Sequence, residues 1–250
     1  MVFTIGSMRQ MRAGRTGWRG AARIAALSAD PGPAPGVRTG ARRWTRASAA
    51  ATVGEYTALC GWAVAPGARA SRGGGACSCG DAGCAAPGAH PLSFAAEVPA
   101  GASAQEAARM WAQTPGAAVL LPTGRTFDVI DVAEASGLRA LARLERMGLR
   151  LGPVLATPDR RAQFFVAPGA AQDLPQLLYR MGWDDAELDL RCLGPGGHVT
   201  APPSDAGGLG PVRWLRDPRP GVRSPVPQPP EARLLLGTLA YVSHRARVHA

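Results

Sequence analysis

The segment FDVIDVAEASG, residues 127–137, is the most informative part of the sequence, because an apolar strand-like run passes directly into a helix-like run. Asp131 lies near the end of the strand-like part, and a residue two positions later points to the same face of a strand. A second carboxylate at that position would share a divalent cation with the first. The position holds Ala133, so the segment supplies only one acid of such a pair.

Two nearby acids are alternatives for the missing carboxylate. Glu134 follows Ala133 directly, and a local bulge in the strand would turn its longer side chain toward the site. Asp128 lies three residues before Asp131, so it points to the opposite face of a regular strand. The other interpretation is that Asp128 and Glu134 are solvated acids at the ends of the strand.

The formal net charge of +10 is concentrated at the two ends of the chain. Residues 1–47 contain nine Arg and one acid, and residues 213–250 contain seven Arg and two acids. Residues 48–212 carry twelve Arg against fifteen acids, a net charge of about −3. Bulk positive potential therefore does not predict nucleic-acid binding by the central part, which would need a local patch or the terminal segments.

Composition divides the chain into four regions. We expect a disordered Arg/Ala/Gly-rich tail over 1–47, one folded domain over 48–217, a Pro-rich linker over 218–230, and a helix with a basic end over 231–250. The helix docks either on the domain or on a partner. No run of about 18 apolar residues and no secretion signal occurs, which predicts a cytoplasmic protein without a membrane span. No GxxxxGK[ST] phosphate loop follows, so we expect a stand-alone domain.

Helix-like and strand-like segments follow one another in mixed order through the folded domain. Residues 103–113 are predicted to form a helix, because Ser103 and Glu106 have the spacing of a capping box. Residues 117–122 and 127–132 are predicted to form a hairpin through the turn between them. The other expected elements are a short helix and turn over 49–62, a helix over 136–147 with Leu138, Leu141, Leu144 and Met147 on its apolar stripe, strands over 153–157 and 163–166, a helix over 174–181, and strands over 188–191 and 198–201. This order indicates an α+β fold with a mixed, largely antiparallel sheet and flanking helices.

A Gly-rich loop over 73–91 holds three of the five cysteines and one of the four histidines. They follow a CxCx4Cx5H pattern, which consists of Cys77, Cys79, Cys84 and His90. Four such ligands can close a tetrahedral zinc site. The spacing differs from the usual CxxC pairs, so the alternative is a flexible loop of reduced thiols or an adventitious disulfide. A reduced compartment favours a metal over a disulfide.

Five short segments of the domain occur in a recognisable order. They are Thr123-Gly124, 129–132 (VIDV) with Gly137, Thr157-Pro158 with Arg161 before Phe164-Phe165, 188–191 (LDLR), and Gly196-Gly197 followed by 201–204 (APPS). Together they resemble the bifunctional DNA primase/polymerase N-terminal (prim-pol) domain of the archaeo-eukaryotic primase superfamily. The resemblance covers roughly residues 50–217.

The resemblance implies nucleotidyl transfer in DNA replication, in which two Mg²⁺ or Mn²⁺ ions activate a 3′-hydroxyl and stabilise the leaving pyrophosphate. Asp131 matches the first of two paired acids, and Asp189 matches a third acid from a later strand. Ala133 stands in place of the second acid. A phosphate-contacting histidine falls on Ala162, or on Gln163 if the register slips by one. We therefore expect a degenerate site with weak or lost catalysis, because a lost phosphate contact is worth about 3 kcal/mol of transition-state stabilisation.

Three further residues have two interpretations each. Arg161 and Arg191 either bind triphosphate or template phosphates or form surface ion pairs with Asp189 or Asp159. His198 is either a general acid or phosphate ligand or a partly exposed residue at the start of a strand.

The resemblance implies a nucleic acid or a nucleotide as the partner. The alternative is a non-catalytic nucleic-acid- or protein-binding regulatory module on the same fold.

Overall fold

The computed structural model describes residues 46–184, 186–218 and 228–248. Most of the predicted disordered tail and of the predicted Pro-rich linker lies outside these residues. The described part contains, in order, α1 (Arg46–Ala58), β1 (Ala65–Gly67), α2 (Ala104–Trp111), β2 (Ala118–Pro122), β3 (Asp128–Ala133), α3 (Glu134–Arg146), β4 (Val154–Ala156), β5 (Arg161–Val166), α4 (Ala170–Arg180), β6 (Leu190–Leu193), β7 (His198–Thr200), β8 (Arg213–Arg216) and α5 (Ala232–Val248).

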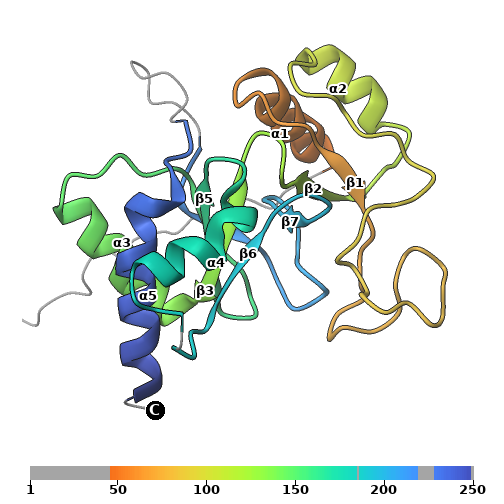
Figure 1. Cartoon of the computed structure of the whole chain (residues 1–250). Coiled ribbons are helices and arrows are strands. Elements are labelled where there is room, and N and C mark those ends of the chain that lie inside the picture. Colours follow the sequence, from red (N-terminus) through yellow and green to blue (C-terminus); the bar gives the residue numbers. More distant parts are fainter. Residues whose placement is uncertain (1–45, 185, 219–227, 249–250) are drawn as a thin grey trace, which may run out of the picture. The chain divides into compact units, whose positions relative to one another are not determined.

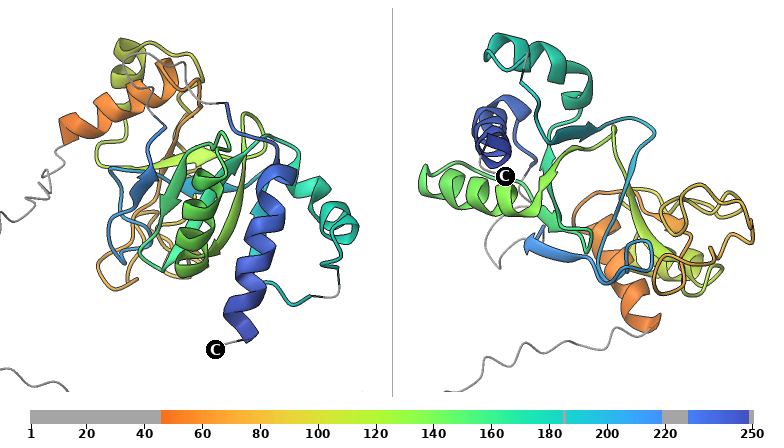
Figure 2. Two further views of the ribbon diagram at one scale, coloured as in Figure 1. Left: turned by 90° about the vertical axis from the view of Figure 1, so that its left-hand side faces the viewer. Right: turned by 90° about the horizontal axis from the view of Figure 1, so that it is seen from below.

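The strands form two sheets with antiparallel pairing. One sheet has three strands in the order β1-β2-β7, and the other has five in the order β6-β3-β5-β4-β8. Helices α3, α4 and α5 lie on one side of the five-stranded sheet, and α1, α2 and the three-stranded sheet lie on the other (Figures 1 and 2). The predicted α+β fold, with largely antiparallel sheets and flanking helices, is confirmed.

The alternation of side chains along β3 assigns its two faces. Ile130 and Val132 are buried in the hydrophobic cluster that includes α3 and α5. Val129 is buried in the second cluster, which includes α1, α2 and β2. Asp131 follows Val129 by two positions, so it points to the same side of the sheet as Val129. The candidate site therefore lies on the sheet face that α3, α4 and α5 do not cover.

The predicted hairpin between residues 117–122 and 127–132 is wrong. Strand β2 pairs with β1 and β7, whereas β3 pairs with β5 and β6 in the other sheet. The turn between β2 and β3 packs on the β6–β7 loop, because the Thr123 amide donates to the carbonyl of Gly197 and its hydroxyl donates to the carbonyl of Gly194 at 2.6 Å. These contacts from distant residues direct the chain from one sheet into the other, and a local apolar pattern does not reveal them.

Helix α2 has the predicted capping box. The Ser103 hydroxyl accepts a hydrogen bond from the amide of Glu106, and the Glu106 carboxylate accepts one from the amide of Ser103 at 2.9 Å. Two amides that the helix itself cannot satisfy are thereby paired, which fixes the helix start at the predicted position.

Helix α3 buries a different stripe from the predicted one. Leu141 and Leu144 are buried as expected, but Leu138 is 44% and Met147 is 61% exposed. The buried stripe instead includes Gly137, where an added Cβ would lie 2.3 Å from the Cβ of Ala162 on β5. The helix approaches the sheet through its small residues, so the stripe is rotated away from the bulky side chains.

The C-terminal helix α5 docks on the domain, which is one of the two placements expected from the sequence. Leu235, Leu236 and Leu239 are fully buried in the same cluster as the apolar residues of α3. On its outer side, the Tyr241 ring lies under the guanidinium of Arg143, 5.4 Å from the ring centre. Helix α5 therefore belongs to the core of the domain.

Candidate functional site

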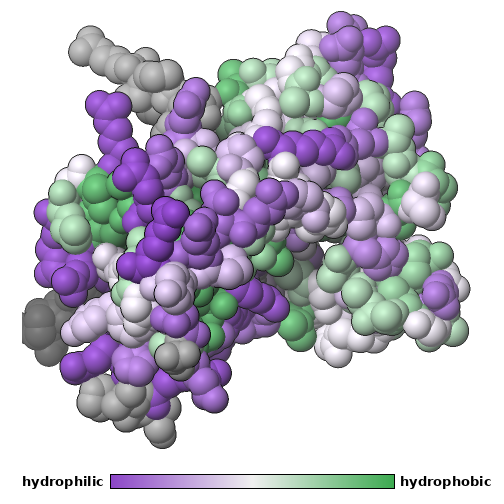
Figure 3. All heavy atoms as spheres, in the orientation of Figure 1, coloured by the Kyte–Doolittle hydropathy of each residue, from purple (hydrophilic) through white to green (hydrophobic). Residues whose placement is uncertain are grey.

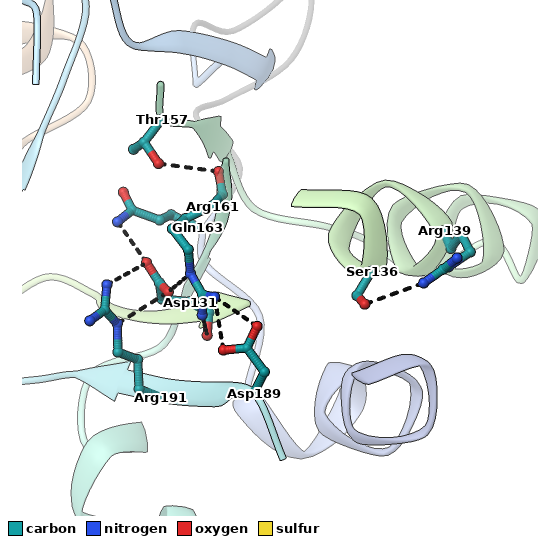
Figure 4. A network of polar contacts seen from close by, with 8 residues as sticks. All are labelled: Asp131, Ser136, Arg139, Thr157, Arg161, Gln163, Asp189 and Arg191. Atoms are coloured by element: carbon teal, nitrogen blue, oxygen red, sulfur yellow. Dashed lines mark hydrogen bonds and ion pairs between the residues drawn. The ribbon is translucent and has the colours of Figure 1, made fainter. Parts of the chain in front are cut away.

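Asp131 is the centre of a polar network on the sheet face away from α3, α4 and α5 (Figure 4). Its side chain is 0% exposed. The Nε atoms of Arg161 and Arg191 donate to its Oδ1 at 2.7 and 3.2 Å, and Nε2 of Gln163 donates to its Oδ2 at 2.9 Å. Both carboxylate oxygens of Asp131 are therefore occupied by protein donors.

Arg161 joins the two acids that the sequence singled out. Its Nη1 donates to both oxygens of Asp189 at 2.7 and 2.8 Å (Figure 4). Burial lowers the pKa of the Arg161 guanidinium, but the hydrogen bonds to Asp189 and Asp131 outweigh burial and raise that pKa. Arg161 thus forms the ion pair that was one of its two interpretations, and Arg191 pairs with Asp131.

The register of the strands explains why these side chains meet. Asp131 lies opposite Gln163 on β5 and opposite Arg191 on β6, and Ala133 lies opposite Arg161. Residues that face each other across antiparallel strands project from the same face of the sheet. The small side chain of Ala133 therefore leaves room beside Asp131, and the guanidinium of Arg161 reaches into that position.

The family's phosphate-contacting histidine was aligned with Ala162 or, after a slip of one residue, with Gln163. Of these two residues, Gln163 lies on the sheet face that carries Asp131. Ala162 is 0% exposed and points to the opposite face, toward α3. The Gln163 amide is held by its bond to Asp131, and its Oε1 is buried without a hydrogen-bond partner among the described residues.

The two alternative acids do not complete the site. Glu134 is the first residue of α3, no bulge interrupts β3 before it, and its carboxylate pairs with Arg213 of β8. Asp128 points away from Asp131, as expected for a regular strand. The prediction that Asp128 is solvated is wrong, because it is 0% exposed and its Oδ2 accepts a hydrogen bond from the amide of Ala171 in α4 at 2.9 Å.

His198 belongs to the three-stranded sheet, on β7. Burial lowers the pKa of His198, and the charge of Arg125 adds to this effect while Glu97 opposes it. Arg125 and Glu97 form an ion pair with each other at 2.5 Å. Within the described ranges no hydrogen bond or ion pair joins His198 to the Asp131 network.

The charges of the network cancel, since Arg161 and Arg191 balance Asp131 and Asp189. A site for two divalent ions needs an excess of negative oxygen ligands. Among the described residues, one group of three or more His, Cys, Asp or Glu side chains has ligand atoms close enough for one ion, and it lies in the cysteine loop. The residues around Asp131 do not fit a pair of Mg²⁺ or Mn²⁺ ions.

A hollow of about 360 Å³ lies beside the network. Its charged lining consists of Asp159, Arg161, Asp189, Arg191 and Arg247. Three guanidinium groups and two carboxylates make this a polar surface of mixed charge, unlike the mainly apolar pockets that enclose small ligands. On the face shown in Figure 3, strongly hydrophilic residues gather over α5 and its surroundings, whereas the cysteine loop carries paler residues.

The cysteine loop has the geometry of a metal site. The ligand atoms of Cys77, Cys79, Cys84 and His90 all lie within 4.8 Å of one another. Nε2 of His90 is 3.5 Å from Sγ of Cys77 and 3.4 Å from Sγ of Cys84. A tetrahedral zinc ion with Zn–S bonds of about 2.3 Å would separate its ligand atoms by about 3.5–3.8 Å. The donors therefore fit one tetrahedral ion.

Neighbouring backbone groups prepare two of these ligands. Hydrogen bonds from the amides of Cys79 and Gly88 lower the pKa of Cys77 to about 6. Nδ1 of His90 lies 2.8 Å from the carbonyl oxygen of Pro91, and this contact, followed by the one with Cys77, raises the pKa of His90. When His90 is neutral, a proton on Nδ1 leaves Nε2 free as the metal-facing atom.

The two antiparallel sheets and their flanking helices form the class of α+β domain that the resemblance implied. The family model described as bifunctional DNA primase/polymerase, N-terminal, matches residues 54–232, and the chain belongs to this family. The match includes the cysteine loop and reaches the first residue of α5. The comparisons with curated proteins and with solved structures gave no match. No helix in the described ranges is long and apolar enough to cross a membrane.

Sequence reasoning missed the positions of two polar residues. Gln163 contacts Asp131 because the pairing of β3 with β5 places these two residues opposite each other. In the sequence, the one indication was the alternative alignment of the family's histidine with Gln163. Asp128 lies between Phe127 and Val129, two fully buried residues, and that apolar context was the available signal for its burial. Nothing near Asp128 in the sequence indicated its contact with α4.

Proposed function

We propose that this chain is a DNA primase/polymerase-like domain with weak or lost nucleotidyl transfer, in which an arginine–carboxylate network takes the place of the metal ions. The buried carboxylate of Asp131 supports this most directly. A carboxylate that binds a divalent ion must direct a lone pair at it. The lone pairs of Asp131 are directed at Arg161, Arg191 and Gln163.

Metal binding would require this network to break. A divalent ion about 4 Å from the guanidinium of Arg161 would be repelled by about 8 kcal/mol at an effective dielectric constant of about 20. If Arg161 moved away, Asp189 would lose its ion pair. Ala133 supplies no further carboxylate to offset either cost, so the charge that would hold two ions is missing.

A primer-extension and dinucleotide-synthesis assay with Mn²⁺ tests this proposal. We expect no incorporation by the full chain above that of its Asp131→Asn variant. Asp189→Asn serves as the second control, because Asp189 is partly exposed and its loss disturbs packing less. Incorporation by the wild-type chain that both substitutions abolish would establish an active enzyme and overturn the proposal.

A variant that removes one arginine of the network and adds a second carboxylate provides a positive control for metal binding. The double variant Ala133→Asp, Arg161→Ala places a second carboxylate beside Asp131 and removes the competing cation. We expect this variant to bind Mn²⁺, measured by the loss of the free-ion paramagnetic resonance signal, more tightly than the wild-type chain. Equal Mn²⁺ binding by both proteins, lost in each on Asp131→Asn, would show that Arg161 does not block the site.

We further propose that the metal of the cysteine loop is zinc. Three thiol ligands and one imidazole favour zinc over the hard ions Mg²⁺ and Ca²⁺. When bound, the ion closes the loop and supplies structural stability, while Cys77, Cys79, Cys84 and His90 hold it. Metal analysis of the purified chain should find about one zinc per chain, and Cys79→Ser should reduce the content. A wild-type chain that is produced in zinc-containing medium and holds no zinc after purification would contradict the assignment.

A non-catalytic nucleic-acid- or protein-binding regulatory module is the second candidate function. The neutral Asp131 network favours it, because the network pairs the buried charge without any metal. Salt-dependent DNA binding by the full chain, unchanged in the Asp189→Asn variant, is the expected result. Binding that requires Mn²⁺ and Asp189 would instead assign nucleic-acid recognition to the polymerase site.

A further inference from the structure

Two adjoining hollows follow the cysteine loop and share no lining residue with the hollow beside Asp131. The larger has a volume of about 1000 Å³ and the smaller about 230 Å³. Arg69, Ser78, Gly116 and Ala117 line both of them. We call this continuous surface, including Arg72 on its larger part, the cysteine-loop groove.

The charge of the groove comes mainly from two arginines. Arg69 and Arg72 are exposed, and neither has an ion-pair partner in the part of the chain that the structure describes. Asp205 is the one acid on the lining of the larger hollow. The guanidinium of Arg69 lies beside Gly116, where an added Cβ would be 3.4 Å from its central carbon. Gly116 therefore leaves the guanidinium accessible from the groove.

An exposed aromatic ring lies at the smaller end of the groove. Phe94 is 77% exposed, the largest exposed fraction among the bulky apolar residues that the structure describes, and it lines the smaller hollow together with Arg69. The exposed face of the ring is available for stacking against a partner. An aromatic ring on the same surface as cationic side chains is the combination that binds single strands, because bases stack on the ring while guanidinium groups contact phosphates.

The groove also lies where the folded part of the chain begins. Ala49, in the first turn of α1, lines the larger hollow. The segment that precedes it, residues 1–47, carries nine Arg and one acid. By charge alone, this segment and the groove would attract the same polyanion.

We propose that the cysteine-loop groove binds single-stranded nucleic acid, with Arg69 and Arg72 at phosphates and Phe94 stacked on an unpaired base. This inference rests on the nucleic-acid-binding function proposed above and assigns it to a surface other than the Asp131 site. The stacking contact requires unpaired bases, so the groove prefers a single strand to a duplex.

Fluorescence anisotropy of the full chain with a labelled 20-nucleotide single strand tests the groove. The double variant Arg69→Ala, Arg72→Ala should bind more weakly than the wild-type chain, and the slope of log affinity against log salt should fall by about 1.4, or about 0.7 for each lost phosphate contact. The matched control is Arg150→Ala, Arg180→Ala, which removes the same charge from exposed positions outside the groove and should leave the slope nearly unchanged. Equal effects of the two double variants would overturn the assignment to the groove.

Phe94→Ala separates base stacking from charge. It should weaken binding of the single strand at least about fivefold, as expected for one lost stacking contact, and leave binding of a duplex unchanged. Because Phe94 is exposed, the substitution should not affect folding, which thermal unfolding would verify. Equal losses for single strand and duplex would refute the stacking role. If the groove variants lose binding to a polyglutamate peptide but keep their binding to oligonucleotides, the groove binds an acidic protein segment and the proposal is overturned.

The wild-type chain distinguishes failure of this inference from failure of the proposed function. If the wild-type chain binds neither single strand nor duplex at low salt, both the nucleic-acid function and the groove assignment fail. If it binds the single strand and the groove variants bind equally well, only the groove assignment fails.

Discussion

Substitution of Asp131 by Asn distinguishes an ion-pair network from a metal site by the sign of the stability change. In a site whose clustered carboxylates await metal ions, removing one negative charge relieves repulsion and stabilises the metal-free protein. In the observed network, the same change removes the partner of Arg161 and Arg191. The introduced asparagine side chain would also direct an amide donor toward one of the donors that now surround the carboxylate.

The magnitude follows from the exposure of the three charged side chains. Removal of one partner from a buried ion pair costs about 3–5 kcal/mol. Arg161 is 18% exposed and keeps its ion pair with Asp189, which places the loss at the low end of that range. Arg191 is 62% exposed, so solvent screens its contact with Asp131 and it adds little. We expect Asp131→Asn to lower the free energy of unfolding by about 3 kcal/mol.

Urea unfolding followed by circular dichroism, in buffer without added Mg²⁺ or Mn²⁺, measures this change. Asp189→Asn is the matched control, because Asp189 is 38% exposed and its removal leaves Arg161 paired with Asp131. The control should lose about 1 kcal/mol or less. An Asp131→Asn variant as stable as the wild-type chain, or more stable, would refute the interpretation of Asp131 as an ion-pair residue.

Three further predictions concern one buried and two partly buried groups. Asp128→Ala should lower the free energy of unfolding by about 1–2 kcal/mol in urea titrations, because its carboxylate pairs with an amide in the first turn of α4. Burial lowers the pKa of His198, so the unfolded chain binds more protons below the ordinary value of 6.5, and stability should fall as the pH drops through that region. His198→Gln should reduce this fall in unfolding measured between pH 7 and 5. Burial, with the nearby charge of Asp128, raises the pKa of Cys192 to about 12, so the folded chain retains a proton that the unfolded chain loses above pH 9. Stability should therefore fall as the pH rises from 9 toward 12, and less steeply in Cys192→Ala.

Local patterns were sufficient for several elements and for one cluster of ligands. The capping-box spacing placed the start of α2, because that motif is satisfied within four residues. The cysteine pattern placed Cys77, Cys79, Cys84 and His90 together, because the four ligands lie within fourteen residues and the loop is held by backbone bonds to the segment just before it. In both cases the determining contacts are near in sequence.

Features set by distant contacts were not predictable in the same way. The turn after β2 resembled a hairpin turn, but Thr123 bonds to the β6–β7 loop and sends β3 into another sheet. The stripe of α3 was expected to follow its leucines, but Gly137 sets the approach to β5. The pairing of Arg161 with both Asp131 and Asp189 depends on the registers of three strands, which one sequence does not specify.

The Asp131 network explains how a buried carboxylate is accommodated on this face of the sheet. A carboxylate at the position of Asp131 is buried by the sheet itself, so its charge must be balanced whether or not the domain is an enzyme. A bound cation or a cationic side chain can balance it. The residue opposite Ala133 on β5 is Arg161, whose guanidinium supplies positive charge beside Asp131. Arg161 fills this role and reaches Asp189 as well, so one guanidinium contacts both remaining acids. Ala133 leaves space on this face, and the guanidinium of Arg161 lies next to it. A carboxylate introduced by Ala133→Asp alone would therefore lie beside that guanidinium, which would compete with any incoming cation for it.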